Sequence, residues 1–167
     1  MDYQTRELPT REALLRVQER ENFTPDVSGV DLVLTLITTA DLVRASIFDR
    51  LAKSYDISEG KFTLLMSLYA EGDTGASELA ARIGVAPATV SVMVKRMLSA
   101  PQPLISMSRT SSDGRSRLIA LTSAGQALIR EALPGHFDAI RAFAEVLSET
   151  ERESLITMLR KLLRKKR

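Results

Sequence analysis

The segment 76–122 constrains the fold more than any other part of this 167-residue chain. It predicts a short helix over 77–83, which Gly84 ends in the left-handed conformation that glycine adopts at low cost. A second helix is predicted from Pro87 to about Ser99, because proline is tolerated in the first turn of a helix. Two helices joined by so short a turn are typical of a helix-turn-helix.

A β-hairpin is predicted directly after the second helix. Pro101 and Pro103 end that helix, and two strands follow at 104–107 and 118–121. Between the strands, the pair Asp113-Gly114 favours a tight turn. We therefore expect a mainly α fold with a small β-hairpin wing, an arrangement that can hold DNA in two adjacent grooves.

The flanking segments are predicted to be helical. The helix expected over 30–55 is apolar nearly all round, and in a chain of this size a second subunit is the simplest way to bury it. A long helix begins near Thr122, and a capping box at Ser148–Glu151 opens the last one. The expected organisation is an N-terminal extension with a short helix (1–29), a DNA-binding lobe (56–121) and a helical dimerisation region formed by 30–55 and 122–167.

Composition excludes several classes of function. The chain has no Cys and a single His, His136, which rules out thiol catalysis, thiolate metal sites and multi-histidine metal sites. No nucleophile–base set or phosphate loop is present, so neither an enzyme nor a bound cofactor is expected. We expect a cytoplasmic protein, since a chain without Cys suits a reducing compartment. No signal peptide is expected, because residues 1–7 lack a basic start followed by an apolar core, and no membrane span, because Asp31, Asp41 and Arg44 interrupt the most apolar stretch.

The second helix of the motif has two chemically different faces. A buried stripe is expected at Val90, Met93, Val94, Met97 and Leu98. The opposite face is small at its start and basic near its end, and it carries Ala88, Thr89, Ser91, Val92, Lys95, Arg96 and Ser99. Such a face can approach a groove and meet phosphates. The alternative is an ordinary amphipathic helix with a solvated polar face.

The hairpin concentrates positive charge at Arg109, Arg115 and Arg117. An arginine at a hairpin tip can enter a narrow minor groove, where negative potential is strongest. The alternative is a solvated hairpin whose charges protect it from edge-to-edge pairing. The hairpin supports the DNA-binding interpretation because it follows the helix-turn-helix immediately.

These motifs resemble the MarR family of bacterial winged-helix transcriptional regulators. The matching segments are Ser77-Glu-Leu-Ala-Ala-Arg-Ile-Gly-Val85, Ala88-Thr-Val-Ser-Val-Met-Val94 and Asp113-Gly-Arg-Ser-Arg-Leu-Ile-Ala-Leu-Thr-Ser-Ala-Gly125. The resemblance runs from about Val30 to the C-terminus. It implies a homodimer clasped by its terminal helices, with one winged-helix lobe per subunit. Such a dimer is expected to bind double-stranded DNA sequence-specifically and to act as a transcriptional regulator, most simply a repressor.

The resemblance also implies a set of DNA-contacting residues. Pro87 to Ser99 would be the recognition helix in the major groove, and Arg115 the wing residue in the minor groove, with Asp113 orienting nearby arginines. The full set comprises Ser77, Pro87, Ala88, Thr89, Ser91, Val92, Lys95, Arg96, Arg109, Ser111, Asp113, Gly114, Arg115 and Arg117.

Two features depart from the family pattern. Ala86, Pro87 and Val92 stand where hydroxyl, basic or amide side chains often read base edges, so readout would depend on Ser91, on methyl contacts and on DNA shape. The link 99–103 is also longer and stiffer than the usual glycine-containing one. These departures leave open a winged-helix dimerisation or interaction module that does not bind DNA.

Many members of the family respond to a small phenolic or carboxylate-bearing effector, held between the dimer helices and the DNA-binding lobe. The corresponding pocket residues here would be Thr38, Asp41, Arg44, Phe62 and Met66. The alternative is that Phe62 and Met66 belong to the core, and that Asp41 and Arg44 form a surface pair at helical spacing. His136 is expected to serve packing or the surface rather than a pH switch.

Overall fold

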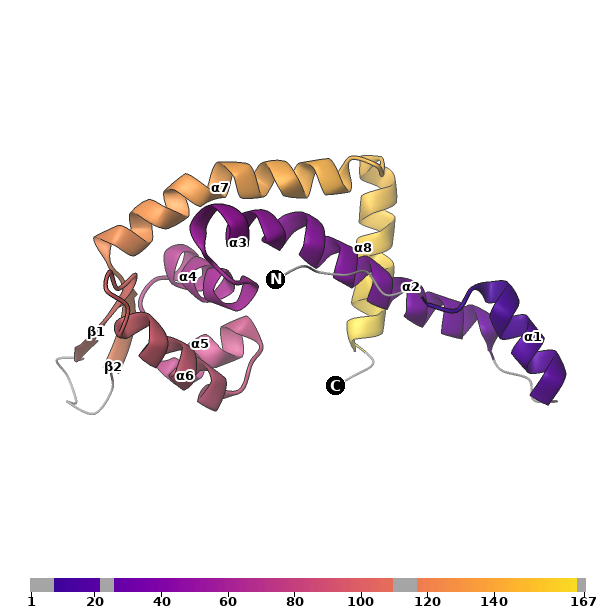
Figure 1. Ribbon diagram of the computed structural model, residues 1–167, viewed down its shortest axis with the longest axis horizontal. Helices are drawn as coiled ribbons and strands as arrows, with labels where there is room; N and C mark the ends of the chain where they lie inside the picture. Colours follow the sequence, from indigo (N-terminus) through magenta and orange to yellow (C-terminus); the bar gives the residue numbers. More distant parts are fainter. Residues whose placement is uncertain (1–7, 22–25, 110–116, 165–167) are drawn as a thin grey trace. The chain divides into compact units, whose positions relative to one another are not determined.

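The computed structural model describes residues 8–21, 26–109 and 117–164 and is mainly helical with a two-stranded wing (Figure 1). The described chain forms two compact units, one made of the residues up to Asp49 and from Phe137 onward, the other of Arg50–His136. The elements in order are α1 (Arg11–Glu21), α2 (Val27–Val43), the π-helical segment η1 (Arg44–Phe48), α3 (Asp49–Tyr55), α4 (Glu59–Glu71), α5 (Ala76–Ile83), α6 (Pro87–Leu98), β1 (Ile105–Arg109), β2 (Arg117–Leu121), α7 (Ser123–Ala144) and α8 (Glu149–Arg164).

In the first unit, the N-terminal helix α1 packs on α2. Thr10 caps α1, because its hydroxyl oxygen accepts a hydrogen bond from the Ala13 amide at 3.2 Å. An exposed ion pair between Arg11 and Asp31, 3.7 Å apart, also joins the two helices. The short helix predicted in the N-terminal extension is therefore present.

The helix predicted over 30–55 differs from the observed structure in two ways. It begins earlier, at Val27, because the Asp26 carboxylate accepts a hydrogen bond from the Gly29 amide at 3.0 Å and caps the first turn. It is also interrupted by the π-helical turn η1 before α3 continues to Tyr55. Such turns depend on packing in the folded chain and leave no periodic signal in the sequence.

The core of the second unit lies beneath the helix-turn-helix. Helix α4 begins at the Ser58 cap, and it packs on α5 and β2, while α6 packs on α5 and β1. The largest fully buried side chains come from every element of this unit and include Leu51, Ile57, Leu64, Leu65, Leu79, Val90, Ile105, Ile119 and Ile129. This shared core sets the relative positions of α5, α6 and the hairpin.

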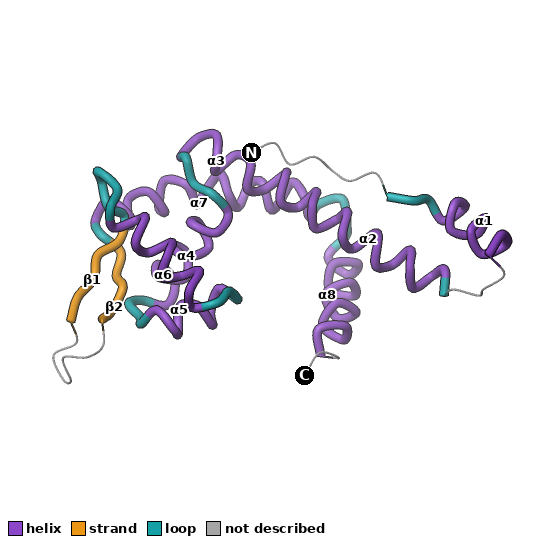
Figure 2. The backbone as a smooth tube through the Cα atoms, turned by 60° about the horizontal axis from the view of Figure 1, so that its bottom comes forward, coloured by secondary structure: helices purple, strands orange, loops and turns teal. Residues whose placement is uncertain are grey.

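The wing is an antiparallel pair in which Ile105 stands opposite Leu121 and Arg109 stands opposite Arg117 (Figure 2). Thr74 adds a single bridge to β2: its amide donates to the Ile119 carbonyl at 3.1 Å, and the Ile119 amide returns a bond of 2.9 Å. The start of the helix-turn-helix is thereby hydrogen-bonded to the base of the wing.

The last two helices begin with side-chain caps. At α7, the Thr122 hydroxyl oxygen accepts from the Gly125 amide at 3.1 Å. At α8, the predicted capping box is confirmed, since the Ser148 amide donates to Glu151 at 2.8 Å and the Glu151 amide donates to Ser148 at 3.4 Å. Within the described ranges, no single helix is long and apolar enough to cross a membrane. Helices α5 and α6 reach that length and apolar composition only when taken together, and the pair is bent by 109°.

Candidate nucleic-acid interface

Helices α5 and α6 meet at 109°, within the range of helix-turn-helix motifs (Figure 1). Gly84 makes this turn with a φ of +70°, and the Val85 amide closes it by donating to the Ala80 carbonyl at 3.1 Å. Pro87 then occupies the first turn of α6, as predicted. The turn is thus produced by local sequence signals.

Helix α6 buries one face and exposes the other. Val90, Val94 and Met97 are buried against the core, while Val92 on the opposite side is 52% exposed. Every described residue predicted to contact DNA from α5 or α6 is exposed, namely Ser77, Pro87, Ala88, Thr89, Ser91, Val92, Lys95 and Arg96. The fold therefore gathers these side chains on a solvent-facing surface of the helix-turn-helix.

The hydroxyl hydrogen of Ser91 already forms a hydrogen bond within α6. Its Oγ donates to the Pro87 carbonyl within the helix at 3.0 Å. The oxygen lone pairs remain, so in this rotamer Ser91 can accept a hydrogen bond but not donate a second one. In a major groove the matching donors are the N4 amino group of cytosine and the N6 amino group of adenine.

The two helices of the motif lack the side-chain caps found elsewhere in the chain. Gly75 precedes α5 and Ala86 precedes α6, and neither makes a side-chain hydrogen bond to its helix. By contrast, α2, α4 and α8 are capped by Asp26, Ser58 and Ser148. Uncapped amides at a helix N-terminus can bind phosphate oxygens, which the helix dipole also favours.

A polar network that was not predicted from the sequence links α5 to α4 and to Thr74, behind the exposed surface of the helix-turn-helix. Arg82 of α5, with its side chain 19% exposed, pairs with Glu78 at 2.7 Å and with Glu71 of α4 at 3.2 Å. Glu78 also accepts a hydrogen bond from the Thr74 hydroxyl at 2.8 Å. The bond from Thr74, followed by the contact with Arg82, lowers the pKa of Glu78. The spacing of Glu78 and Arg82 was a visible signal, but Thr74 and Glu71 join them only through the fold.

The structure describes the wing as far as the cross-strand pair of Arg109 and Arg117. Arg109 and Arg117 occupy one cross-strand position, and the Arg117 side chain is exposed. The remaining predicted wing residues, Ser111, Asp113, Gly114 and Arg115, lie outside the described residues. The register therefore places two cationic residues at the same level of the hairpin.

The five residues predicted for an effector pocket fall into two different units, so their common site stays a prediction. In the first unit, the half-buried Thr38 donates to the Leu34 carbonyl at 3.0 Å, and Arg44 pairs with Asp41 at 3.5 Å. In the second unit, Met66 is half-buried and Phe62 is buried.

Phe62 lies against His136, with ring centroids 4.5 Å apart. Burial lowers the pKa of His136, since an apolar environment disfavours the charged imidazolium. This aromatic contact agrees with the prediction that His136 serves packing.

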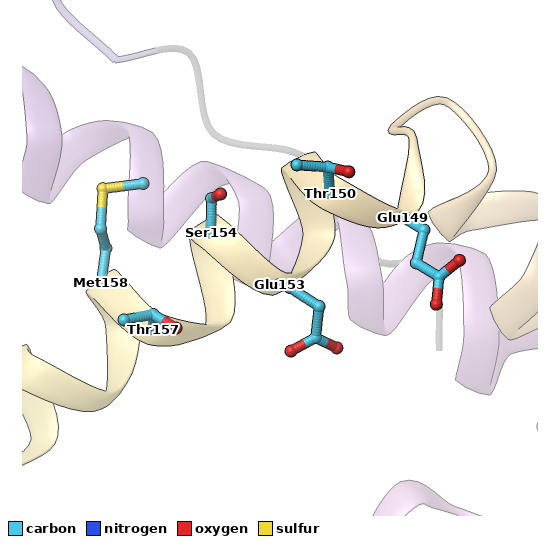
Figure 3. Close-up of a pocket in the computed structure, with 6 residues that line it drawn as sticks. All are labelled: Glu149, Thr150, Glu153, Ser154, Thr157 and Met158. Carbon is cyan, nitrogen blue, oxygen red and sulfur yellow. The ribbon is translucent and has the colours of Figure 1, made fainter.

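A hollow of about 660 Å³ lies on α8 of the first unit. All six residues that line it belong to this one helix, and Figure 3 shows their side chains spread along it. Because a single helix cannot enclose a ligand, this is an open helix face rather than a binding site.

Known proteins share both the motif and the fold. A MarR family model matches residues 57–116. The HTH-type transcriptional repressor YetL of Bacillus subtilis (strain 168) is 31% identical over 136 residues, which make up 80% of this chain and 80% of that protein.

Two solved structures illustrate the shared fold. Sco3205, a MarR family transcriptional regulator from Streptomyces coelicolor in complex with DNA, has a TM-score of 0.75 at 21% identity, covering 84% of this chain and 89% of that one. BpsR of Bordetella bronchiseptica, whose DNA binding is regulated by 6-hydroxynicotinic acid, has a TM-score of 0.66 at 24% identity, covering 78% and 98%. At these identities the structures establish the common fold alone.

Proposed function

Because the chain belongs to the MarR family of winged-helix transcriptional regulators, we propose that it is a homodimeric, sequence-specific DNA-binding repressor. Helix α6 enters the major groove of double-stranded DNA, and the arginine-bearing wing contacts the adjacent minor groove. The relative YetL is named a repressor, and Sco3205 was solved with DNA, which supports this assignment.

The observation that carries the proposal is the exposed face of α6. Its first half presents the small residues Ala88, Ser91 and Val92, which let the helix approach the groove floor. Its last turns present Lys95 and Arg96 at the level where phosphates flank the groove. Ser91 accepts a hydrogen bond from a base amino group, and Val92 can contact a thymine methyl.

Backbone and wing contacts supply the rest of the affinity. The uncapped N-termini of α5 and α6 offer amide groups to phosphates. The cross-strand arginines Arg109 and Arg117 add positive charge, and Arg115 is assigned to the minor groove. The bridge between Thr74 and Ile119 keeps the wing in register with the helix-turn-helix.

The apolar faces of the first unit support a homodimer. Helices α2 and α8 bury none of their residues within the chain. Large apolar side chains are exposed on both, including Leu32, Val33 and Leu42 of α2 and Leu155, Met158, Leu162 and Leu163 of α8. Exposed apolar area of this extent is typical of a surface that a partner covers, and a second copy of the chain is the proposed partner.

A small-molecule effector is part of the proposal. BpsR responds to 6-hydroxynicotinic acid, which supports a phenolic or carboxylate-bearing ligand for this chain as well. Thr38, Asp41, Arg44, Phe62 and Met66 are the residues we assign to it. Binding of such a ligand would relieve repression by favouring a state of lower DNA affinity.

The proposal is tested by measuring affinity for duplex DNA from upstream of the protein's own gene over a range of salt concentrations. We expect affinity to fall steeply with salt, because each neutralised phosphate contributes about −0.9 to the slope of log K against log salt. Arg115→Ala should weaken binding. Unmeasurable duplex affinity at low salt, from a protein that forms a stable dimer, would instead support a dimerisation module without DNA binding.

A further inference from the structure

The helix-turn-helix carries a single carboxylate, that of Glu78 in the first turn of α5. Helices α5 and α6 and the turn between them (76–98) contain no other Asp or Glu. Glu78 directly follows Ser77, which is an assigned DNA contact, and its side chain is 63% exposed. A negative charge at this place repels an approaching phosphate, so the conformation of the Glu78 side chain bears on DNA binding.

Glu78 is the third residue of α5, a position from which a glutamate can bend back to the amide of the capping residue. In α8 this happens: Glu151 is also the third residue, and its carboxylate accepts from the Ser148 amide at 2.8 Å. In α5 it does not, because no side chain forms a capping hydrogen bond at Gly75. The same residue type at the same helix position therefore has two different partners in this chain.

Two neighbouring side chains hold the Glu78 carboxylate elsewhere. The Thr74 hydroxyl donates to Oε2 at 2.8 Å, and the Arg82 guanidinium donates to Oε1 at 2.7 Å. Each carboxylate oxygen thus has a partner other than a helix amide. The equivalent residues beside α8 and within it are Leu147 and Leu155, whose side chains offer no hydrogen bond. Thr74 and Arg82 therefore account for the difference between the two helices.

Both partners of Glu78 are themselves fixed by the fold. Thr74 is only 2% exposed, and its backbone forms both hydrogen bonds of the bridge to Ile119. The Arg82 side chain also pairs with Glu71 at 3.2 Å, at the end of helix α4, which packs on α5 (Figure 1). Because these groups are already ordered, they can determine the conformation of a more exposed neighbour at little further cost in entropy.

We propose that Thr74 and Arg82 are positioning residues for DNA binding: they hold the only carboxylate of the helix-turn-helix away from the start of α5, where Ser77 contacts DNA. This rests on the proposed function, which assigns Ser77 to DNA. A released Glu78 would cap α5 as Glu151 caps α8, and its charge would stand where the helix N-terminus attracts a phosphate. Arg82 also neutralises the carboxylate, which reduces its repulsion of the DNA.

Thr74→Val is the sharpest test, because it removes the hydroxyl without changing the charge and keeps the backbone bridge to β2. We expect this variant to bind duplex DNA from upstream of the protein's own gene about fivefold more weakly, equivalent to about 1 kcal/mol, the usual strength of a side-chain cap. The slope of log K against log salt should become shallower by up to about 0.9, since one phosphate contact is lost. Thr74→Ser keeps the hydroxyl and should bind DNA as the wild type does.

Thr63→Val is the matched control for the loss of a hydroxyl. Thr63 lies half-buried in α4 of the same unit, and its hydroxyl donates to the Glu59 carbonyl at 2.9 Å. This substitution makes the same chemical change without touching Glu78. It should therefore leave both DNA affinity and the salt slope unchanged.

The effect should depend on the carboxylate itself. Glu78→Ala should bind DNA at least as tightly as the wild type, and in this background Thr74→Val should have no further effect. Arg82→Met should weaken DNA binding in the wild-type background and do so less in Glu78→Ala, where no carboxylate is left to neutralise. A general loss of stability would instead weaken binding equally in both backgrounds.

Unchanged DNA affinity in Thr74→Val, equal losses in the two backgrounds, or weaker binding by Glu78→Ala would each overturn the proposal. A wild-type protein that binds no duplex contradicts the proposed function instead. Hydrogen exchange followed by NMR on the isotope-labelled full chain still decides the position of Glu78. The Gly75 amide should exchange more slowly in Thr74→Val than in the wild type or in the double variant with Glu78→Ala, and equal rates in all three would overturn the positioning role.

Discussion

Gly125, in the first turn of α7, lies against the carbonyl oxygen of Leu104, so closely that a β-carbon at this position would overlap that oxygen. Thr122 reinforces the contact: its amide donates to the Leu104 carbonyl at 3.0 Å, and its hydroxyl donates to the Pro103 carbonyl at 2.8 Å. The residues just before β1 are thus fastened to the residues just after β2. This clasp closes the base of the wing.

Gly125→Ala should separate the first turn of α7 from the Leu104 carbonyl. The overlap is with backbone, which cannot rotate away, so we expect a loss of about 1–3 kcal/mol in the free energy of unfolding. Denaturant unfolding measures this loss. Gly75→Ala is a matched control, because a β-carbon there meets no atom within 4 Å. Equal losses in the two variants would contradict the role of the clasp.

Arg82→Met should loosen the brace between α4 and α5. The substitution keeps the apolar stem and removes contacts to Glu71 and Glu78, so we expect a loss of about 1–2 kcal/mol in unfolding free energy. Arg141→Met removes a more exposed pair with Asp138 and should cost less than about 0.5 kcal/mol. Thermal unfolding of both variants checks this difference, and an Arg82 variant as stable as the Arg141 variant would argue against the brace.

Two substitutions on α6 should separate base readout from phosphate binding. Ser91→Ala removes a single hydrogen-bond acceptor and should reduce discrimination at one base pair by about 0.5–1.5 kcal/mol. Lys95→Gln should weaken binding to all sequences alike and reduce the salt slope by about 1. Competition binding with single-base operator variants measures both effects. A Ser91 variant with unchanged sequence preference would remove this residue from the readout.

His136 should make stability depend on pH in the mildly acidic range. Burial against Phe62 lowers its folded-state pKa below the value of about 6.5 in the unfolded chain. Between these two pKa values the unfolded chain binds more protons, so stability is fully present above about pH 6.5 and falls as the pH decreases toward the folded pKa. His136→Gln should flatten this part of the profile. The check is the free energy of unfolding measured against pH for the wild type and the variant. The same pH dependence in both proteins would contradict this role of His136.

The local parts of the fold were predictable because single residues determine them. Gly84 and Pro87 determine the turn of the helix-turn-helix, and Ser148 with Glu151 starts α8. The same holds for the exposed face of α6, which follows from helical spacing.

Features that depend on long-range packing were not predictable. The bridge between Thr74 and Ile119 joins residues far apart in the sequence, and the ion pair between Glu71 and Arg82 joins two different helices. The π-helical turn at 44–48 likewise exists only once several elements have packed together.

The most direct test of the central claim is footprinting of the purified protein on the DNA upstream of its own gene. A homodimer with α6 in the major groove should protect a near-palindrome whose half-sites lie about one helical turn apart, roughly 10 base pairs. Protection should disappear at high salt and weaken in Arg115→Ala. Absence of a protected site at low salt, with the protein folded and dimeric, would contradict the account.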